Sequence, residues 1–418
     1  MYSLLDRAFK FVVKTGSLQV TAPDGRLYKY GDGTGETVHF AIANHDAARR
    51  IALDADLALG ECYMDGSLTL KTGTIYDVLA LLMANAEAQS MPRVARMLYR
   101  LRMVMKRADQ YNPIGKAKQN VAHHYDLSGA IYDLFLDRDR QYSCAYFETA
   151  DASLEQAQVA KKRHLAAKLM IRPGMKVLDI GSGWGGLGLY LAEICGARVT
   201  GLTLSEEQHK LSNERAQQRG LGTQAQYRLL DYRLLDERFD RIVSVGMFEH
   251  VGVGHYKEFF GRVKDLMKPD GIAVLHSINR SDGPGATSAW VKKYIFPGGY
   301  IPALSEVLPH IERHKLYVTD IEILRLHYAE TLKAWSDHFA SNRERGKEIY
   351  DERFCRMWEF YLAAAEAAFR FAGMNNFQIQ FVKNQHALPL TRNYMVEEEA
   401  RLKALEAKRP RLMSVRAE

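Results

Sequence analysis

Short apolar runs alternate with longer amphipathic stretches in the C-terminal part of the chain. The runs have strand length, and their Val, Ile and Leu content is typical of strands buried on both faces. The predicted helices lie at 154–170, 187–193, 206–219 and between 246 and 271, and the predicted strands at 176–180, 198–202, 225–229, 241–245 and 272–276. This alternation predicts an α/β fold, a mostly parallel, doubly wound sheet whose ligands bind at the carboxyl ends of the strands.

The N-terminal part has a different pattern. Strand-like runs at 18–20 and 38–42 are separated by Gly-containing turns such as Asp24-Gly25 and Asp65-Gly66, with helical stretches between them. We therefore expect a smaller α+β domain over residues 1–112. A larger domain over 113–395 and a charged helix with a tail over 396–418 complete the predicted organisation.

Composition narrows the class of protein. The chain has 418 residues, of which 47% are hydrophobic and 26% charged, which is ordinary for a globular protein. It shows no apolar stretch of membrane-spanning length and no cleavable N-terminal signal. Its four cysteines lack C-x-x-C spacing and no H-E-x-x-H motif is present, so we expect neither a disulfide framework nor a metal site, and a reducing cytoplasm.

The net charge of +7 indicates an anionic partner, either nucleic acid or an acidic membrane surface. Residues 92–107 form a predicted amphipathic helix with arginines on one face and apolar residues such as Met97 and Leu101 on the other. Such a helix can lie at a lipid interface. The alternative is a helix packed on its own domain with a solvated basic face.

A glycine-rich loop follows the predicted strand at 176–180. Gly181, Gly183 and the following glycines permit a sharp turn and close approach of the backbone to a bulky ligand. Gly185 stands one position ahead of the third glycine of a dinucleotide loop, a position that Gly186 fills. We interpret the early glycine as suited to a cofactor without a pyrophosphate, such as S-adenosylmethionine. A dinucleotide and a purely structural turn remain alternatives.

Several further motifs resemble one family when they are taken in order along the chain. They are His124-Tyr125-Asp126, Tyr142 to Phe147, the glycine loop, Leu202 to Gln208, Asp231-Tyr232-Arg233, Ser244 to Gly252, Leu275 to Ile278, and Tyr294 to Tyr300. Together they resemble the cyclopropane-fatty-acyl-phospholipid synthases, S-adenosylmethionine-dependent methyltransferases that act on lipid double bonds. The resemblance implies a Rossmann-like class I methyltransferase domain and an extra N-terminal domain.

The family pattern implies a cofactor site for S-adenosylmethionine. Gly181, Gly183 and Trp184 would lie along its methionine part, with Thr203, Leu204 and Gln208 near the ribose. Asp231 and Tyr232 would lie at the adenine, and Tyr142 and Ser143 would close over the cofactor. Helix capping at Thr203 and an exposed position for Gln208 are the alternatives from local sequence alone.

The resemblance also implies a bound bicarbonate that acts as the catalytic base. The backbone at Cys144 and Ile278 would hold it, together with the side chains of Glu249, His276 and Tyr328. Glu249 would accept a hydrogen from bicarbonate or orient His276. No activating base is near Cys144 in the sequence, which argues against a thiol nucleophile.

Aromatic faces can stabilise the carbocation that methyl transfer leaves on an alkene. The candidates for this substrate lining are Tyr146, Phe147, Phe248, Tyr294, Phe296, Tyr300 and Tyr328. Residues 290–308 would form part of a tunnel for the acyl chain. Departures from the family pattern at Gly129-Ala130 and at 138–140 bear on substrate preference. Ala365 stands where some members have cysteine, which argues against a catalytic role for a thiol at this position.

The resulting hypothesis is transfer of a methylene group from S-adenosylmethionine to the cis double bond of an unsaturated phospholipid. The partners would be the membrane lipid and an anionic lipid surface at the inner face of the membrane, and the resemblance favours a homodimer. A methyl- or methylene-branched product and a noncatalytic lipid-binding protein are the rival interpretations. A nucleic-acid methyltransferase is disfavoured because neither an N-P-P-Y-type motif nor an RNA-binding module is found.

Overall fold

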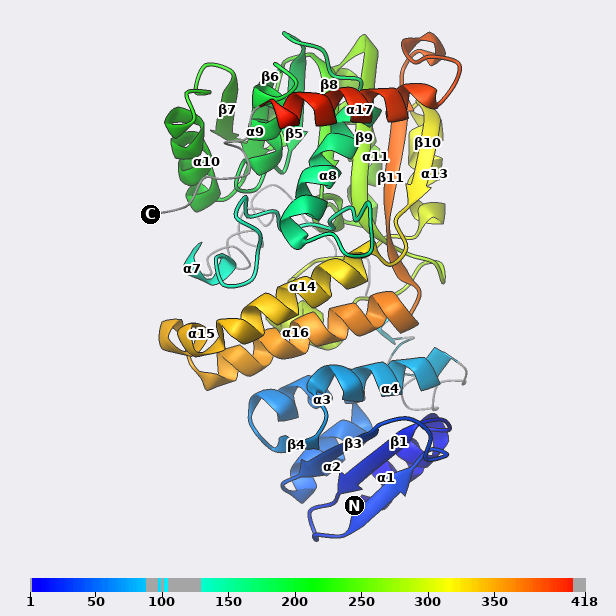
Figure 1. Ribbon diagram of the computed structural model, residues 1–418. Helices are drawn as coiled ribbons and strands as arrows, with labels where there is room; N and C mark the ends of the chain where they lie inside the picture. The colour runs from blue at the N-terminus through cyan, green and yellow to red at the C-terminus, as the bar shows by residue number, and fades with distance from the viewer. Residues whose placement is uncertain (1, 88–96, 98, 100, 104–128, 409–418) are drawn as a thin grey trace.

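The computed structural model describes residues 2–87, 97, 99, 101–103 and 129–408, and they form two domains (Figure 1). The N-terminal domain has a four-stranded sheet in the order β2-β1-β3-β4. Its elements are α1 (Tyr2–Val12), β1 (Ser17–Thr21), β2 (Leu27–Tyr30), β3 (Thr37–Ile42), α2 (His45–Leu53), α3 (Ala55–Met64), β4 (Leu68–Thr72) and α4 (Ile75–Glu87). The expected α+β composition and the strands near 18–20 and 38–42 are confirmed.

The larger domain is built on a seven-stranded sheet in the order β10-β11-β9-β8-β5-β6-β7. The strands are β5 (Lys176–Ile180), β6 (Arg198–Thr203), β7 (Ala225–Leu229), β8 (Phe239–Val245), β9 (Met267–Arg280), β10 (Tyr317–Ile323) and β11 (Met374–Val382). The five strands from β7 to β9 pair in parallel, and β11 and β10 add antiparallel to that edge. The predicted mostly parallel sheet is confirmed.

The helices of this domain are α7 (Gly129–Tyr132), α8 (Leu154–Lys168), α9 (Gly186–Glu193), α10 (Glu206–Gln218), α11 (Tyr256–Leu266), α12 (Ala289–Tyr294), α13 (Leu304–Arg313), α14 (His327–Ser341), α15 (Arg343–Ile349), α16 (Glu352–Phe371) and α17 (Asn393–Ala407). Some of them cover the two faces of the sheet, whereas α14 to α16 lie at one end of it, next to the N-terminal domain (Figure 1). Helix α17 packs against α8, so the charged segment predicted at 396–418 begins as a docked helix. Residues 409–418 of the predicted tail lie outside the described residues.

The strand order reverses between β5 and β8. From β5 the chain proceeds outward to β6 and β7, and then returns to place β8 on the other side of β5. Loops at the carboxyl ends of β5 and β8 therefore diverge and leave a crevice between them. Because Val177, Leu178 and Ile180 are buried, β5 is held rigidly beneath that crevice.

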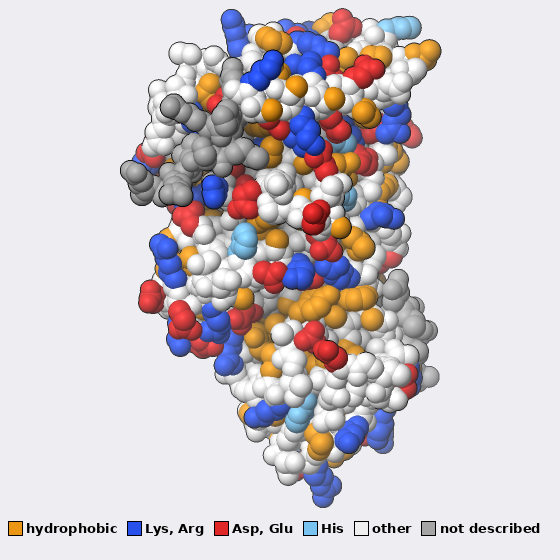
Figure 2. All heavy atoms as spheres, in the orientation of Figure 1, with side chains coloured by type: hydrophobic (Ala, Val, Ile, Leu, Met, Phe, Trp, Pro, Cys, Tyr) orange, Lys and Arg blue, Asp and Glu red, His pale blue; other side chains and the backbone are white. Residues whose placement is uncertain are grey.

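The N-terminal domain packs on the larger domain through α3 and α4, which contact α16, and through α3, which contacts α12 (Figure 1). Hydrophobic side chains gather on the visible face where the two domains meet, whereas charged ones are spread over both (Figure 2). The described part of the predicted basic helix is helical at 97, 99 and 101–103, and Arg102 pairs with Asp54 and Asp56. Among the described residues no helix combines the length and the apolarity needed to span a bilayer.

Candidate cofactor and catalytic site

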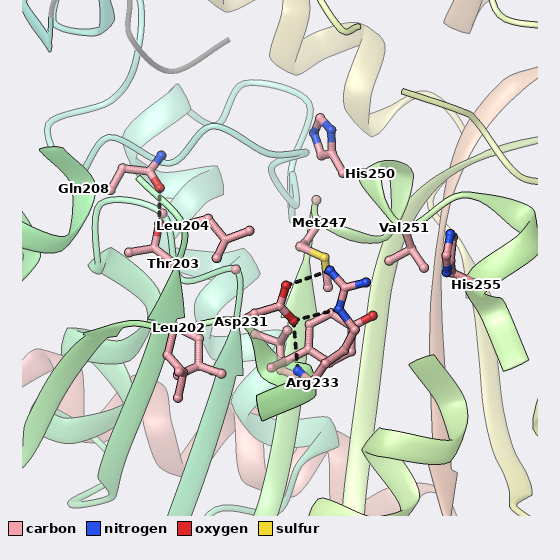
Figure 3. A pocket seen from close by; sticks show the side chains of 16 residues that line it. Leu202, Thr203, Leu204, Gln208, Asp231, Arg233, Met247, His250, Val251 and His255 are labelled. Carbon is pink, nitrogen blue, oxygen red and sulfur yellow. Dashed lines mark hydrogen bonds and ion pairs between the residues drawn. The ribbon is translucent and has the colours of Figure 1, made fainter. Parts of the chain in front are cut away.

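A pocket opens at the crevice between β5 and β8, where the topology predicts a ligand site (Figure 3). It contains seven of the ten predicted cofactor residues, namely Gly181, Gly183, Thr203, Leu204, Gln208, Asp231 and Tyr232. Its remaining lining residues are Ile180, Leu202, Leu230, Arg233, Gly246, Met247, His250, Val251 and His255. The residues that the sequence placed around one ligand therefore do lie around one cavity.

The glycine loop forms one wall of the pocket, and its backbone requires glycine. Gly181 and Gly183 have φ angles of +81° and +53°, which residues with a Cβ rarely adopt. A Cβ on Gly181 would lie 2.7 Å from the Met247 side chain, whereas a Cβ on Gly183 would meet nothing within 4 Å. The open space at Gly183 fits a ligand that approaches the backbone closely.

Thr203 and Gln208 form a polar pair on the β6 side of the pocket. The Thr203 hydroxyl donates to Gln208 Oε1 over 2.8 Å, and Figure 3 shows the two side chains joined. Ser205 caps α10 by accepting from the Gln208 backbone N–H. Both alternatives from local sequence, capping by Thr203 and an exposed Gln208, are wrong, because Ser205 makes the cap and Gln208 is buried.

Asp231 is fixed by its neighbour Arg233, which the sequence analysis did not single out as a site residue. The Arg233 guanidinium donates to both carboxylate oxygens of Asp231, at 2.9 and 2.7 Å. The same guanidinium lies 5.8 Å from the centre of the Tyr232 ring. One cation, Arg233, therefore holds both the acid and the ring that were predicted to meet adenine. Arg233 was already visible in the sequence as the last residue of the motif Asp231-Tyr232-Arg233.

His250 lines the opposite side of the pocket and was also missed. Burial lowers the pKa of its imidazole to about 4. The ring is therefore neutral at physiological pH, which suits a pocket for a positively charged ligand. Its place after Glu249 in the motif was visible in the sequence, but its direction into the pocket was not.

Three predicted cofactor residues lie beside the pocket rather than in its lining. The Ser143 Cβ and the Tyr142 carbonyl oxygen approach Gly246, at 3.7 and 3.9 Å from where its Cβ would stand. Trp184 is buried against Tyr132, with ring centres 5.3 Å apart. Tyr142 and Ser143 are therefore close enough to a lining residue for a small movement to bring them onto a ligand.

Glu249 and Ile278 meet behind the pocket. Glu249 Oε1 accepts from the Ile278 backbone N–H at 2.7 Å, so this N–H is already engaged. Glu249 Oε2 is buried and finds no hydrogen-bond partner within the described part of the chain. Burial raises the pKa of this carboxyl group. A small oxyanion such as bicarbonate, which carries its own hydrogen, fits this acceptor.

His276 lies fully inside the sheet, on β9. Its two ring nitrogens lie 3.4 Å from Asn376 Nδ2 and 3.2 Å from Gln378 Nε2, both on the neighbouring strand β11. Burial lowers the pKa of the imidazole to about 3, so the ring is neutral. The side chains that orient His276 are therefore these two amides, which come from a strand that the sequence analysis did not predict.

Cys144 and Tyr328 are both buried near the predicted closing segment. Burial raises the pKa of the Cys144 thiol well above its usual range, which agrees with its predicted lack of a nucleophilic role. Tyr328 packs edge-on against Trp335 and Phe369, with ring centres 5.7 and 4.8 Å away.

The predicted substrate aromatics do not all come together. Phe248 is in the core, where it stacks on Tyr256, and Tyr146 is sandwiched between the rings of His164 and His327. The Phe147 backbone N–H donates to His327 Nδ1 at 2.9 Å. Tyr294 and Tyr300 donate their hydroxyls to Glu61 and Glu306, respectively.

Phe296 joins an aromatic cluster in which Tyr142 and Tyr328 were also predicted site residues, whereas Trp335 and Tyr361 were not. Its ring centre lies 5.9 Å from that of Tyr361, whose hydroxyl is 2.8 Å from the Tyr142 hydroxyl. Tyr142 packs in turn against Trp335, which contacts Tyr328. We define the aromatic cluster as Tyr142, Phe296, Tyr328, Trp335 and Tyr361. Its late members come from α14 and α16, so only long-range packing could reveal it.

Comparison with known proteins agrees with this site. Residues 114–379 match the family model for mycolic acid cyclopropane synthetase, and residues 4–92 match a domain of unknown function, DUF7884. The chain belongs to the mycolic acid cyclopropane synthetase family. Its relatives include the Escherichia coli K12 cyclopropane-fatty-acyl-phospholipid synthase, 36% identical over 375 residues that cover 87% of this chain and 95% of the relative.

A probable fatty acid methyltransferase of Pseudomonas putida is 42% identical to this family member over 287 residues, which cover 66% of this chain and 73% of the relative. Among solved structures, the cyclopropane synthase CmaA1 complexed with SAH and CTAB superposes with a TM-score of 0.61. It shares 32% identity, and the match covers 65% of this chain and 99% of that one. This family member is thus an S-adenosylmethionine-dependent methyltransferase with the predicted Rossmann-like class I fold.

Proposed function

We propose that this protein transfers a methylene group from S-adenosylmethionine to the cis double bond of an unsaturated phospholipid acyl chain and so forms a cyclopropane ring. The observation that supports the proposal is that Glu249 accompanies the pocket. This buried carboxyl group has one oxygen without a hydrogen-bond partner among the described residues. A methyl transfer to the lone pair of an amine can occur before any proton is lost, whereas ring closure removes a proton from carbon and so requires a base in a dry site.

The cofactor supplies an electrophilic methyl group on a sulfonium. The chain's part is to hold it along the glycine loop and to keep cations away from it. The open space at Gly183 admits the ligand, and the neutral imidazole of His250 adds no repulsion. Arg233, the cation in the lining, is neutralised by Asp231.

The substrate alkene is a weak nucleophile, so positioning and exclusion of water must lower the barrier. The aromatic cluster provides apolar ring faces close to Ser143 and Tyr142 at the edge of the pocket. Such faces attract a developing carbocation through their quadrupoles. Buried Trp335 also excludes water from this region.

Ring closure requires a proton to leave the transferred methyl group. Bound bicarbonate would supply the base, held by Glu249, His276, Tyr328 and the backbone at Cys144. The Ile278 N–H, which was also predicted to hold it, would instead orient the Glu249 carboxyl group. Burial keeps the His276 imidazole neutral and raises the pKa of the Glu249 carboxyl group, so both side chains are less charged here than they would be in water. An anion bound there would lie next to the carbocation and stabilise it.

A branched product is the second candidate. It is favoured by the resemblance to the Mycobacterium tuberculosis protein named tuberculostearic acid methyltransferase, which is 34% identical over 349 residues covering 80% of this chain. The two reactions share every step up to the carbocation and differ in the proton that is lost or in a later reduction.

The deciding experiment incubates the purified protein with unsaturated phospholipid vesicles and methyl-labelled S-adenosylmethionine, followed by mass spectrometry of the fatty acids. We expect each modified chain to gain one labelled CH₂ as a ring. A gain of CH₂ that keeps a double bond would establish the branched product instead. Absence of label in lipid would contradict both.

We further propose peripheral contact with an anionic leaflet at the cytoplasmic side of the membrane, and a homodimer. The net charge of +7 supports the first proposal. So does the exposure of Met97 and Leu101 on the apolar face of the basic helix, since a helix packed on its own domain would bury them.

A further inference from the structure

A buried ammonium group lies directly behind the residues predicted to close over the cofactor. Lys161 is on α8, and its side chain is fully buried. Its Nζ donates to Ser143 Oγ at 2.7 Å and to Gln141 Oε1 at 2.9 Å. Burial lowers the pKa of this ammonium group to about 7. While it holds its proton it has only donors, and the Ser143 oxygen then accepts in this bond.

Gln158, one turn earlier on α8, holds the backbone of the same segment. Its Nε2 donates to the carbonyl oxygens of Gln141 and Ser143, at 3.3 and 3.0 Å. Residues three apart on a helix share a face, so Gln158 and Lys161 act on the segment together. The backbone and the side chains of Gln141 and Ser143 are both fixed to α8.

The segment held in this way borders the pocket at Ser143. This residue lies against Gly246, a lining residue at the end of β8. The Gln141 amide touches the position where a Cβ on Gly186 would stand, at the start of α9. Lys161 therefore holds a segment that lies between the edge of the pocket and α9.

We propose that Lys161 is a positioning residue that makes Ser143 a hydrogen-bond donor toward the carboxylate of S-adenosylmethionine. A hydroxyl has one hydrogen, and while its oxygen accepts from the ammonium that hydrogen points to another acceptor. The charge behind the hydroxyl strengthens the bond to an anion. The inference relies on the proposed function only for the identity of the cofactor.

A purely structural role for Lys161 has a different consequence. Asp137 and Asp139 are also close to α8, and loss of the ammonium could loosen the whole segment. A loosened segment would weaken the binding of every ligand of the pocket to the same extent. The proposed role affects only ligands that carry the carboxylate.

The test compares two ligands by calorimetry on the full-length protein. S-adenosylhomocysteine has the carboxylate, and 5′-methylthioadenosine has the same adenosine and thioether without it. We expect Lys161→Met to lower the affinity for S-adenosylhomocysteine about tenfold or more, and the affinity for 5′-methylthioadenosine by less than about twofold. Equal losses for both ligands would overturn the inference. Lys210→Met, at an exposed position of α10, is the matched control and should change neither affinity.

Ser143→Ala keeps the inference testable if Lys161→Met does not fold. It should cause the same selective loss, and unchanged affinity for S-adenosylhomocysteine would contradict the proposal. In the double variant the two losses should not add, because they break one interaction. Wild-type protein that binds S-adenosylhomocysteine but makes no lipid product would contradict the proposed reaction alone. Protein that binds neither ligand would contradict both.

Discussion

Glu249 shows how burial prepares one side chain for a role in catalysis. Its Oε1 is satisfied by the Ile278 N–H, while its buried Oε2 has no partner in the described structure. A carboxylate in that state is destabilised, which is why its pKa is raised. It gains most from a ligand that brings a hydrogen-bond donor.

We expect Glu249→Gln to lower turnover by about 100-fold or more, which is within the range for acid–base groups. The NH₂ group that replaces Oε2 cannot accept a hydrogen bond from the base. Affinity for S-adenosylhomocysteine should stay within about twofold, since Glu249 does not line the pocket. Labelled product and calorimetry measure the two quantities. Glu312→Gln, at an exposed position of α13, is the control. Parallel loss of binding and turnover would count against the role in holding a base.

Single residues of the cofactor loop were predictable because each is part of a local motif. Gly181, Gly183 and Asp231 sit at strand ends, and the sequence shows where strands end. Lys161 was not predictable, because it begins the basic run Lys161-Lys162-Arg163, and lysine is normally exposed. Only the fold shows that it is buried against Ser143.

At the scale of elements, α3 and α12 meet at a contact that leaves room for glycine alone. A Cβ on Gly60 would stand against the Trp290 indole, with Phe360 2.8 Å away. The indole is buried and cannot move cheaply. The backbone N–H of Ala289, the first residue of α12, also donates to the Asp56 carboxylate.

Gly60→Ala tests this contact because two effects oppose each other. Alanine in a helix is more favourable than glycine by about 1 kcal/mol. Overpacking at a buried contact costs about 1–3 kcal/mol. We expect the cost of overpacking to exceed the gain in helix propensity, so that the variant unfolds at a lower temperature than the wild type. Ala55→Ser adds one atom at an exposed position of the same helix and should leave the unfolding temperature nearly unchanged. A more stable Gly60→Ala protein would show that the domains separate there at no cost.

The antiparallel strands β10 and β11 were among the elements that the sequence analysis missed. They are separated by α14 to α16, so they do not follow the regular alternation of strand and helix that revealed the parallel strands. The partners of His276 on β11 were therefore unforeseen. Of the aromatic cluster, Tyr328 on α14 was predicted, whereas Trp335 and Tyr361 were not.

At the scale of the whole molecule, the charge of +7 is spread over a two-domain protein proposed to work at a lipid surface. Charge attraction to an anionic leaflet is screened by salt, with a Debye length of about 10 Å at 0.1 M. Apolar insertion is not weakened by salt. The salt dependence of binding therefore separates the two contributions.

We expect the protein to sediment with vesicles rich in phosphatidylglycerol at low salt and to dissociate progressively as NaCl rises to about 0.5 M. Vesicles of phosphatidylcholine are the control and should retain much less protein at low salt. Equal, salt-independent binding to both would show that charge does not direct the contact.

The sequence by itself determined the elements around the glycine loop, the mostly parallel sheet and seven of the sixteen residues that line the pocket. These features depend on local periodicity and on motifs within a few residues of strand ends. Tertiary structure alone decided which side chains share a cavity, which are buried, and therefore which titrate abnormally. Burial and long-range contacts belong to the folded arrangement and not to any segment, so Lys161 behind Ser143 and His276 between two amides could be seen only there.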